Sequence, residues 1–261
     1  GCLPAALTAA SDGRSLICPK ASGAEAAWVE ATAVIAAPCL AAVLHHLTGQ
    51  NLLEPARPGE VTTHQSAKDL SDVKGQERAK RALEIAAAGR HHMLMVGALG
   101  SEKSMMAARL PGLLPQLSPA NALETSMIHS LNGLLDEGGI SRERPFREPH
   151  STTSMGAIIG GGRSAKPGEI SLAHNGVLFM DEFPKFLRQV LETLRRPIET
   201  GEVMVARANA HVKYPSRFML IAAANPCHCG YLSDPARACA RAPKCGADYL
   251  GRISGPAAGS V

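Results

Sequence analysis

The chain has 261 residues, of which 45% are hydrophobic, 19% are charged and only 3% are aromatic. A chain of this length and composition can bury a sizeable core, so we expect a globular protein of one or two domains. The formal net charge of +4 is weakly basic, which permits a nucleic-acid partner without arguing for one. The few aromatic side chains argue against base stacking as the main way of binding single-stranded nucleic acid.

Membrane-directing segments are not apparent in the sequence. No apolar run approaches the roughly 20 residues of a membrane span, and no charged segment followed by an apolar one opens the chain. The 7 cysteines are an odd number, which fits a reducing compartment better than a disulfide framework. We therefore predict a cytoplasmic protein with no membrane partner.

In chain order, the sequence begins with an alanine-rich block and a linker. Helical signals lie at 23–29 and 38–47 within this block. The stretch 51–72 is rich in proline and polar residues and has no sustained periodicity, which predicts a linker. A helix is predicted over 76–88, with Gly89 at its C-terminal cap, because alanine and leucine recur there at helical spacing.

Strands and helices alternate through the rest of the chain. The expected segments are a strand at 93–96, a helix from Lys103 that Pro111 ends, an insertion or mobile loops over 132–166, a strand at 177–180, a helix from Pro184 that ends before Pro197, a hairpin of 202–206 with 211–214, and a strand at 218–223. This alternation predicts a layered α/β domain.

Residues 97–104, GALGSEKS, follow the first of these strands and come close to a phosphate-binding loop. Such a loop reads G-x-x-x-x-G-K-[ST], because backbone N–H groups must wrap phosphates, a lysine must reach them and a hydroxyl must hold Mg²⁺. The residues that fit are Gly97, Gly100, Lys103 and Ser104. Glu102 replaces the second glycine, where a side chain crowds the phosphate and a carboxylate repels it. We therefore expect a phosphate loop with a damaged centre.

The stretch 176–182, GVLFMDE, ends an unbroken apolar run in two adjacent carboxylates, Asp181 and Glu182. A run that is apolar on both faces suits the central strand of a parallel sheet, and its carboxyl end is the edge where ligands bind. Nucleotide-hydrolysing proteins keep their metal-orienting and water-activating acids at this edge. The alternative is a buried strand that runs into a polar loop.

Four cysteines follow the last predicted strand with the spacing C-x-C-x9-C-x5-C: Cys227, Cys229, Cys239 and Cys245. Four thiolates are a soft tetrahedral set suited to structural zinc. Neither pair has the usual C-x-x-C spacing, and His228 is a further ligand candidate. The alternative is a set of reduced, unliganded thiols near the surface.

Several longer motifs resemble one protein family. They are VKGQERAKRALEIAAAG, MLMVG, KPGEISLAHNGVLFMDEFPKF, LRRPIETGEV, YPSRFMLIAAANPCHCGY and YLGRISGP. Together they closely resemble the ComM/YifB family of magnesium-chelatase-like AAA+ ATPases over roughly residues 73–256.

The resemblance implies an α/β fold with a P-loop NTPase AAA+ core of the magnesium-chelatase branch, in which helices flank a parallel sheet, over 73–256. Residues 1–50 resemble the C-terminal part of the family's N-terminal domain, which is similar to the S5/Lon-protease-like fold, and 51–72 would be the linker. Residues 257–261 would be a tail in place of the family's arginine-finger motif and helical lid. We therefore expect a truncated core that is monomeric or forms a small oligomer other than a ring.

The same resemblance implies a role for each matched site residue. Lys103 would reach the β- and γ-phosphates of ATP, and Ser104 and Asp181 would hold Mg²⁺. Glu182 would orient and deprotonate the attacking water, and Asn225 would contact the γ-phosphate or that water as a sensor. From the residues alone, an asparagine before a proline is more often a turn residue.

For the full-length protein the family implies an ATP-driven hexameric ring that acts on DNA in competence or recombination. Lys213, Arg207 and Arg163 are candidates for contacts with DNA phosphates, and ordinary solvated cations are the alternative. Two other hypotheses are a magnesium-chelatase-type subunit that remodels a protein partner, and a degenerate relative that binds no nucleotide. Glu102 and the missing C-terminal parts predict that ATP hydrolysis by this chain is impaired.

Overall fold

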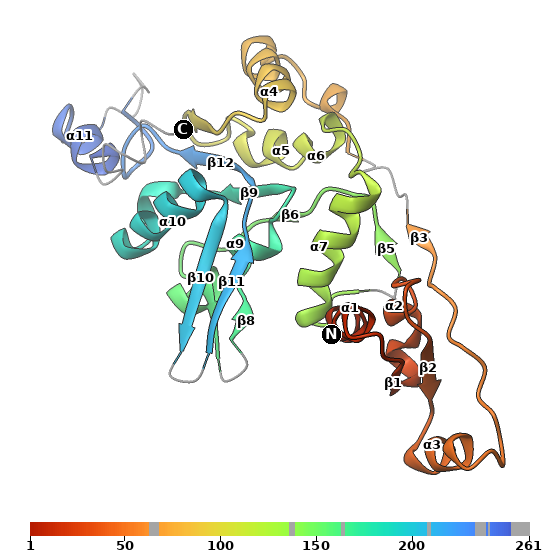
Figure 1. The fold of residues 1–261 in the computed structure, drawn as a ribbon. Coiled ribbons are helices and arrows are strands. Elements are labelled where there is room, and N and C mark those ends of the chain that lie inside the picture. Colours follow the sequence, from red (N-terminus) through yellow and green to blue (C-terminus); the bar gives the residue numbers. More distant parts are fainter. Residues whose placement is uncertain are drawn as a thin grey trace. The chain divides into compact units, whose positions relative to one another are not determined.

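The computed structural model describes residues 1–62, 68–135, 139–162, 165–207, 210–232, 239 and 241–251. These residues divide into two compact units. The first unit is drawn from Gly1–His64 and Leu117–Glu143, and the second from Gln65–Gln116 and Arg144–Val261. Figure 1 labels the helices and strands of both units. In the part of the chain that is described, every helix is too short or too polar to cross a membrane.

The first unit combines short helices with two pairs of parallel strands. Its elements are α1 (Cys2–Ser11), β1 (Leu16–Pro19), η1 (Lys20–Ser22), α2 (Gly23–Ala26), β2 (Val34–Ala37), α3 (Leu40–Leu47), β3 (Val61–Thr62), α7 (Pro119–Leu131) and β5 (Ile140–Ser141). β1 pairs with β2 and β3 pairs with β5. The Glu25 carboxylate of α2 accepts hydrogen bonds from the backbone of Cys2 and Leu3 and from the Ser130 hydroxyl of α7. One acid therefore joins three helices and satisfies N–H groups at the start of α1.

The family resemblance places the ATPase core at 73–256. Residues 117–143 lie within this range but belong to the first compact unit. Leu123 and Met127 of α7 pack against the apolar cluster that contains Leu3 and Ala6 of α1. Which domain of the family each unit represents stays a prediction.

The second unit is built on a four-stranded parallel sheet with the order β4-β12-β9-β6 (Figure 1). Its elements are η2 (Leu70–Asp72), α4 (Glu77–Gly89), β4 (Met93–Val96), α5 (Lys103–Ala107), α6 (Leu110–Leu113), β6 (Phe146–Arg147), α8 (Met155–Ile159), β7 (Gly160–Gly161), β8 (Lys166–Pro167), α9 (Glu169–Leu172), β9 (Val177–Met180), η4 (Phe183–Lys185), α10 (Arg188–Thr200), β10 (Glu202–Arg207), β11 (Ala210–Pro215), β12 (Met219–Ala224) and α11 (Lys244–Leu250).

The two central strands of this sheet, β9 and β12, are buried at every position. Their unbroken apolar runs account for this burial, because a central strand covered on both faces offers no solvent-facing position. Phe179 of β9 stacks on Phe146 of β6, with ring centroids 6.0 Å apart, and belongs to the same core as Leu83 of α4 and Met106 of α5. The predicted α/β class and central strands are confirmed.

Two hairpins extend the second unit beyond the sheet. β10 and β11 pair over six residues each, so β10 is one residue longer than the predicted 202–206 and β11 extends one residue beyond each end of the predicted 211–214. β7 and β8 form a shorter antiparallel pair. The Tyr214 hydroxyl of β11 donates to the carbonyl of Ala165, at 2.8 Å, and so connects the two hairpins.

The predicted cap at Gly89 is wrong by one residue. Gly89 is the last residue of α4, and Arg90 takes the left-handed cap conformation with φ 53°. A Cβ on Gly89 would lie 2.1 Å from the ring of His91, an exposed side chain that would have to turn away. The left-handed conformation that the glycine predicted falls on Arg90, one residue later.

Two prolines also act differently from the prediction. Pro197 does not end its helix, because α10 continues to Thr200 with Pro197 on its buried face beside Val190 and Leu194. Pro111 lies in the first turn of a new helix, α6, where a missing N–H costs nothing, while α5 has already ended at Ala107.

The stretch 132–166, expected to be an insertion or mobile loops, contributes β6 to the main sheet and buries Ile140 and Ile158. Its strands are only two residues long. Strands this short carry no detectable periodicity, which explains the incorrect prediction.

We expect Phe179→Ala to lower the free energy of unfolding by about 3–5 kcal/mol, because the substitution opens a cavity in a closed core. Phe179 is fully buried, whereas Leu187 is 62% exposed, so Leu187→Ala is a control expected to stay within about 0.5 kcal/mol. Urea denaturation of both variants measures the difference. Equal losses would contradict the assignment of the core.

Candidate functional site

The predicted site residues meet at the carboxyl edge of the parallel sheet. β4 leads into the loop 97–104, β9 into Asp181 and β12 into Asn225, and parallel strands end at the same edge. A pocket of about 290 Å³ lies there. It is lined by Leu99, Gly100, Ser101, Glu102, Lys103, Ser104, Met105, Asp181, Glu182 and Asn225. The structure thus places the expected phosphate-loop and catalytic residues together, and their roles stay predictions.

Lys103 is held inside its own loop by oxygen acceptors. Its ammonium donates to the carbonyls of Gly97 (2.9 Å) and Ala98 (3.0 Å), the Ser101 hydroxyl (3.2 Å) and the Asn225 side chain (3.3 Å). Burial lowers the pKa of Lys103 below its ordinary value, and the negative charge of Asp181 opposes that shift. A phosphate bound here would exchange some of these acceptors for its own oxygens.

Ser104 and Asp181 form the direct link between the loop and the acidic strand end. The Ser104 hydroxyl donates to Asp181 Oδ2 at 2.8 Å, across 77 positions of sequence. The other carboxylate oxygen, Oδ1, accepts the backbone N–H of Glu182 at 2.7 Å. Asp181 is therefore oriented by both oxygens, with Oδ2 next to the hydroxyl.

This donor set fits a phosphate group with Mg²⁺. A hydroxyl and a carboxylate are the hard oxygen ligands that Mg²⁺ prefers, and the Lys103 ammonium suits anionic phosphate oxygens. The volume of about 290 Å³ is at the lower end of small-molecule sites, which span about 300–1,000 Å³. The pocket therefore matches the phosphates better than a whole nucleotide.

Glu182 has a left-handed backbone, with φ 50°, and directly precedes the short helix η4. Its carboxylate forms an ion pair with Lys185 of that helix. Both side chains are more than a third exposed, so the pair is solvent-screened and weak. The pair uses Oε1, and a carboxylate accepts hydrogen bonds through two oxygens, so the ion pair does not have to break for Glu182 to accept another hydrogen bond.

Glu102 affects the loop in a way that the sequence predicted only in part. Its backbone is left-handed, with φ 57° and ψ 23°, which is the conformation that a glycine adopts freely. The loop therefore keeps a path suited to glycine, at a cost of about 1–2 kcal/mol for a residue with a Cβ. The exposed carboxylate still lines the pocket and adds negative charge.

Sequence analysis missed a third acid at this edge, Glu148. It follows β6, the strand that pairs with β9. Burial and the negative charge of Asp181 raise the pKa of Glu148 above its ordinary value. The only available signal was its position after a strand, and a two-residue strand is too short to recognise.

The four cysteines after β12 also come together. The sulfur atoms of Cys227, Cys229, Cys239 and Cys245 all lie within 4.8 Å of one another. Burial raises the pKa of the Cys227 thiol, but the hydrogen bond with Cys229 and backbone N–H donors outweigh this effect and lower that pKa to about 7. At Cys239 the backbone N–H of Arg241 lowers the pKa, but the hydrogen bond with Cys229 and burial outweigh this effect and raise that pKa to about 11. The cluster therefore favours the thiolate at Cys227 and the thiol at Cys239.

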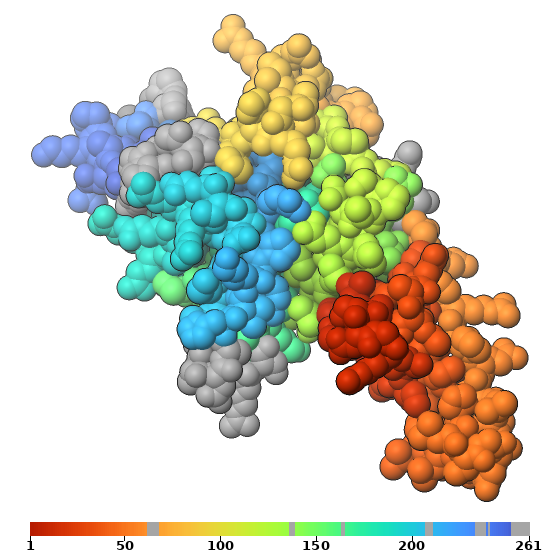
Figure 2. All heavy atoms as spheres, in the orientation of Figure 1, coloured from red at the N-terminus to blue at the C-terminus, as the bar shows by residue number. Residues whose placement is uncertain are grey.

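The expected DNA-contacting cations are only partly described. Arg163 and the side chain of Arg207 lie outside the described residues. Lys213 is exposed on β11 and pairs with Glu202 of β10 at 3.3 Å. Figure 2 shows atoms of this hairpin, in cyan and light blue, at the molecular surface.

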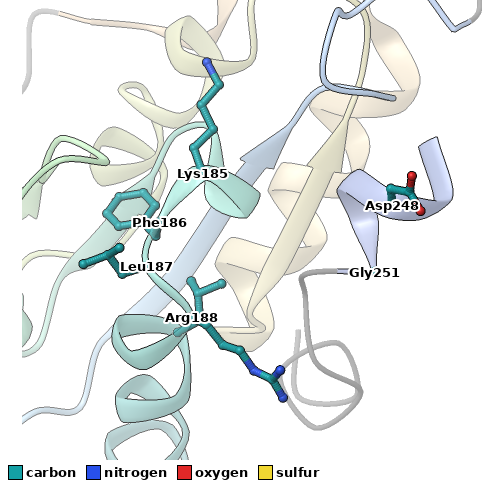
Figure 3. Close-up of a pocket in the computed structure, with 7 residues that line it drawn as sticks. Lys185, Phe186, Leu187, Arg188, Asp248 and Gly251 are labelled. Carbon is teal, nitrogen blue, oxygen red and sulfur yellow. The ribbon is translucent and has the colours of Figure 1, made fainter. Parts of the chain in front are cut away.

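A larger hollow of about 510 Å³ lies between the start of α10 and α11. Its lining residues are Lys185, Phe186, Leu187, Arg188, Leu191, Asp248 and Gly251. Figure 3 shows Lys185 and Arg188 pointing in different directions, so their charges do not converge on one point. The smaller pocket, with its converging polar groups, is the better site candidate.

Comparison with known proteins agrees with this fold. Residues 69–260 match the family described as "Magnesium chelatase, subunit ChlI". The chain is 43% identical over 256 residues to YifB of Escherichia coli (strain K12), covering 98% of this chain and 50% of that protein. It is 44% identical over 263 residues to Competence protein ComM of Haemophilus influenzae, covering 98% of this chain and 51% of that protein.

A more distant relative is the magnesium-chelatase 38 kDa subunit of Rhodobacter capsulatus, which is 26% identical over 191 residues, covering 67% of this chain and 54% of that subunit. The fold and these matches define a magnesium-chelatase-like AAA+ protein. The chain belongs to the ComM/YifB family of these proteins. It spans about half the length of the curated relatives it matches.

We expect Glu102→Gly to stabilise the second unit by about 1 kcal/mol, because it removes the cost of a left-handed backbone at a residue with a Cβ. The matched control is Gly100→Ala, where φ is 77° and the added Cβ meets no atom within 4 Å. That variant should lose about 1 kcal/mol for the same conformational reason. Urea denaturation tests both, and a destabilised Glu102→Gly would contradict the left-handed assignment.

Proposed function

We propose that this chain carries the nucleotide-binding core of an ATP-driven motor that acts on DNA, with a phosphate loop weakened by Glu102. The observation that carries the proposal is the meeting of Lys103, Ser104 and Asp181 at the carboxyl edge of the sheet. The 44% identity to a competence protein supports DNA as the substrate.

Each residue at the carboxyl edge of the sheet has a separate role in this proposal. Lys103 would neutralise phosphate oxygens, while Ser104 and Asp181 would hold Mg²⁺ through hard oxygen ligands. Glu182 would accept a proton from water, and Asn225 would orient that water or the terminal phosphate. Bound Mg-ATP would supply the free energy that drives the motor.

Glu102 acts against this function through its charge. A carboxylate about 4 Å from a phosphate oxygen costs on the order of a few kcal/mol at an effective dielectric constant near 20, and solvent screening of an exposed acid reduces this cost. Each 1.4 kcal/mol weakens affinity about tenfold. We therefore propose that the chain binds Mg-ATP weakly.

The nucleotide part of the proposal is tested by titrating a fluorescent ATP analogue into the chain with Mg²⁺. We expect weak binding by the unmodified chain and at least about tenfold tighter binding by Glu102→Gly. Glu102→Gln keeps the side chain and removes the charge, so it separates electrostatic repulsion from crowding. Glu199→Gln, an exposed acid on α10 that does not line the pocket, is the control. Low-micromolar binding by the unmodified chain would contradict the charge argument.

The DNA part is tested by the salt dependence of binding to single-stranded DNA. Each phosphate contact contributes a slope of about −0.7 to the plot of log affinity against log salt, so Lys213→Gln should flatten the slope by about 0.7. Glu202→Gln should strengthen binding, because it frees Lys213 from its ion pair. Lys20→Gln, which removes an exposed lysine of the first unit, is the charge-matched control.

Two outcomes would count against a DNA motor. One is no binding to DNA at low salt, and the other is equal effects of Lys213→Gln and Lys20→Gln. Stimulation by a protein partner in the absence of DNA binding would favour the magnesium-chelatase-type hypothesis, which the similarity to the 38 kDa subunit supports.

A further inference from the structure

A cluster of four cysteines lies after β12, outside the lining of the nucleotide pocket. Three separate positions of the chain supply it: the turn with Cys227 and Cys229, the residue Cys239, and Cys245 on α11. All four thiols are free, so none of them is in a disulfide bond. The sulfur atoms are close together although neither pair has the C-x-x-C spacing.

The distances suit one small metal ion. A tetrahedral zinc site with Zn–S bonds of about 2.3 Å separates its sulfur atoms by about 3.8 Å. The four sulfur atoms here lie within 4.8 Å of one another, and those of Cys227 and Cys229 are 3.2 Å apart. Shifts of about 1 Å or less therefore reach the zinc geometry.

The ligand type narrows the choice of metal. Four thiolates are soft ligands, which disfavours Mg²⁺ and Ca²⁺ and selects zinc or iron. A multi-iron cluster needs more room, because its thiolates bind different iron atoms around an inorganic core. A closed set of four cysteines is typical of a structural zinc site that keeps no position open for substrate.

We propose that Cys227, Cys229, Cys239 and Cys245 bind one structural Zn²⁺, which holds the segment after β12 against the phosphate loop. Each cysteine binds as a thiolate, so the protons of the thiols pass to solvent when the ion binds. Zinc neither gains nor loses electrons in this step.

The residues next to Cys227 and Cys229 contact the phosphate loop, so a metal bound there would help to fix their position. Asn225, which bonds to Lys103, lies two residues before Cys227. Gly230 follows Cys229 and approaches Leu99 of the phosphate loop so closely that a Cβ would lie 2.8 Å from its side chain. Residues on both sides of Cys227 and Cys229 therefore contact the loop that lines the nucleotide pocket: Asn225 before them and Gly230 after them.

The described part of the same segment contains one short helix, whose Tyr249 ring lies 6.0 Å from the His228 ring. α11 is 7 residues long, and Gly246 and Tyr249 are its buried residues. An isolated helix of this length is not stable in water, so tertiary links must hold it. A zinc ion bound by Cys245 would join α11 directly to the end of β12.

The first experiment measures metal content in the chain purified under reducing conditions without added metal. We expect about one equivalent of zinc, and its loss in Cys239→Ser and Cys245→Ser. Cys39→Ser is the matched control, because Cys39 is exposed and lies in the first unit, outside the cluster. That variant should keep the zinc. Iron in place of zinc, or equal zinc in all variants, would overturn the proposal.

A second experiment does not depend on the folding of the cysteine variants. The unmodified chain is stripped with a chelator under reducing conditions and titrated with Co²⁺, whose absorption spectrum identifies tetrahedral thiolate ligation. We expect saturation at about one ion per chain and displacement by Zn²⁺. No metal in the purified chain together with no tetrahedral Co²⁺ spectrum would overturn the site.

The holding role has its own readout, which needs neither nucleotide nor DNA. Removal of the metal should speed amide hydrogen exchange in 225–232 and 241–251 and leave 1–62 unchanged. Bound zinc without any change in exchange would overturn the positioning role. Because no arm measures ATP or DNA binding, failure here is distinguishable from failure of the proposed motor function.

Discussion

The hydrogen bond between Ser104 and Asp181 is the interaction on which the proposed site depends. It joins a residue at the start of α5 to a residue at the end of β9, 77 positions apart, at 2.8 Å. The apolar strands β9 and β12 make this contact possible, because their burial fixes where each strand ends. The fold thus places two hard oxygen ligands next to the Lys103 ammonium, and this local chemistry supports a phosphate and Mg²⁺ site.

Glu102 separates two requirements of a phosphate loop that glycine normally meets together. One requirement is a left-handed backbone, which Glu102 adopts at an energetic cost. The other is the absence of bulk and negative charge, which Glu102 violates. Under the proposed function, the chain would combine the backbone path of a phosphate loop with a negative charge that opposes phosphate binding. Glu182 is also left-handed, and its ion pair with Lys185 is solvent-screened and weak.

The sequence predicted local structure best where a single physical cause, such as the burial of an apolar run, determined it. The run before Asp181 predicted a buried parallel strand, and the structure buries all four of its apolar residues. Where causes compete, the predictions failed: Arg90 and not Gly89 takes the left-handed cap, and Pro197 lies within a helix with its ring on the buried face. Glu148 was missed because β6 has only two residues. The clustering of the cysteines depends on where α11 places Cys245, which spacing alone cannot predict.

The central claim is that Ser104 and Asp181 act together on one magnesium ion, and a double-mutant cycle measures this directly. Ser104→Ala, Asp181→Asn and the double variant would be made in the Glu102→Gly background, and nucleotide affinity measured with and without Mg²⁺. The account predicts that each single variant loses most of the gain in affinity from Mg²⁺ and that the double variant loses little more, since residues sharing one ligand are not additive. Additive losses, or single variants that keep the full Mg²⁺ dependence, would contradict it.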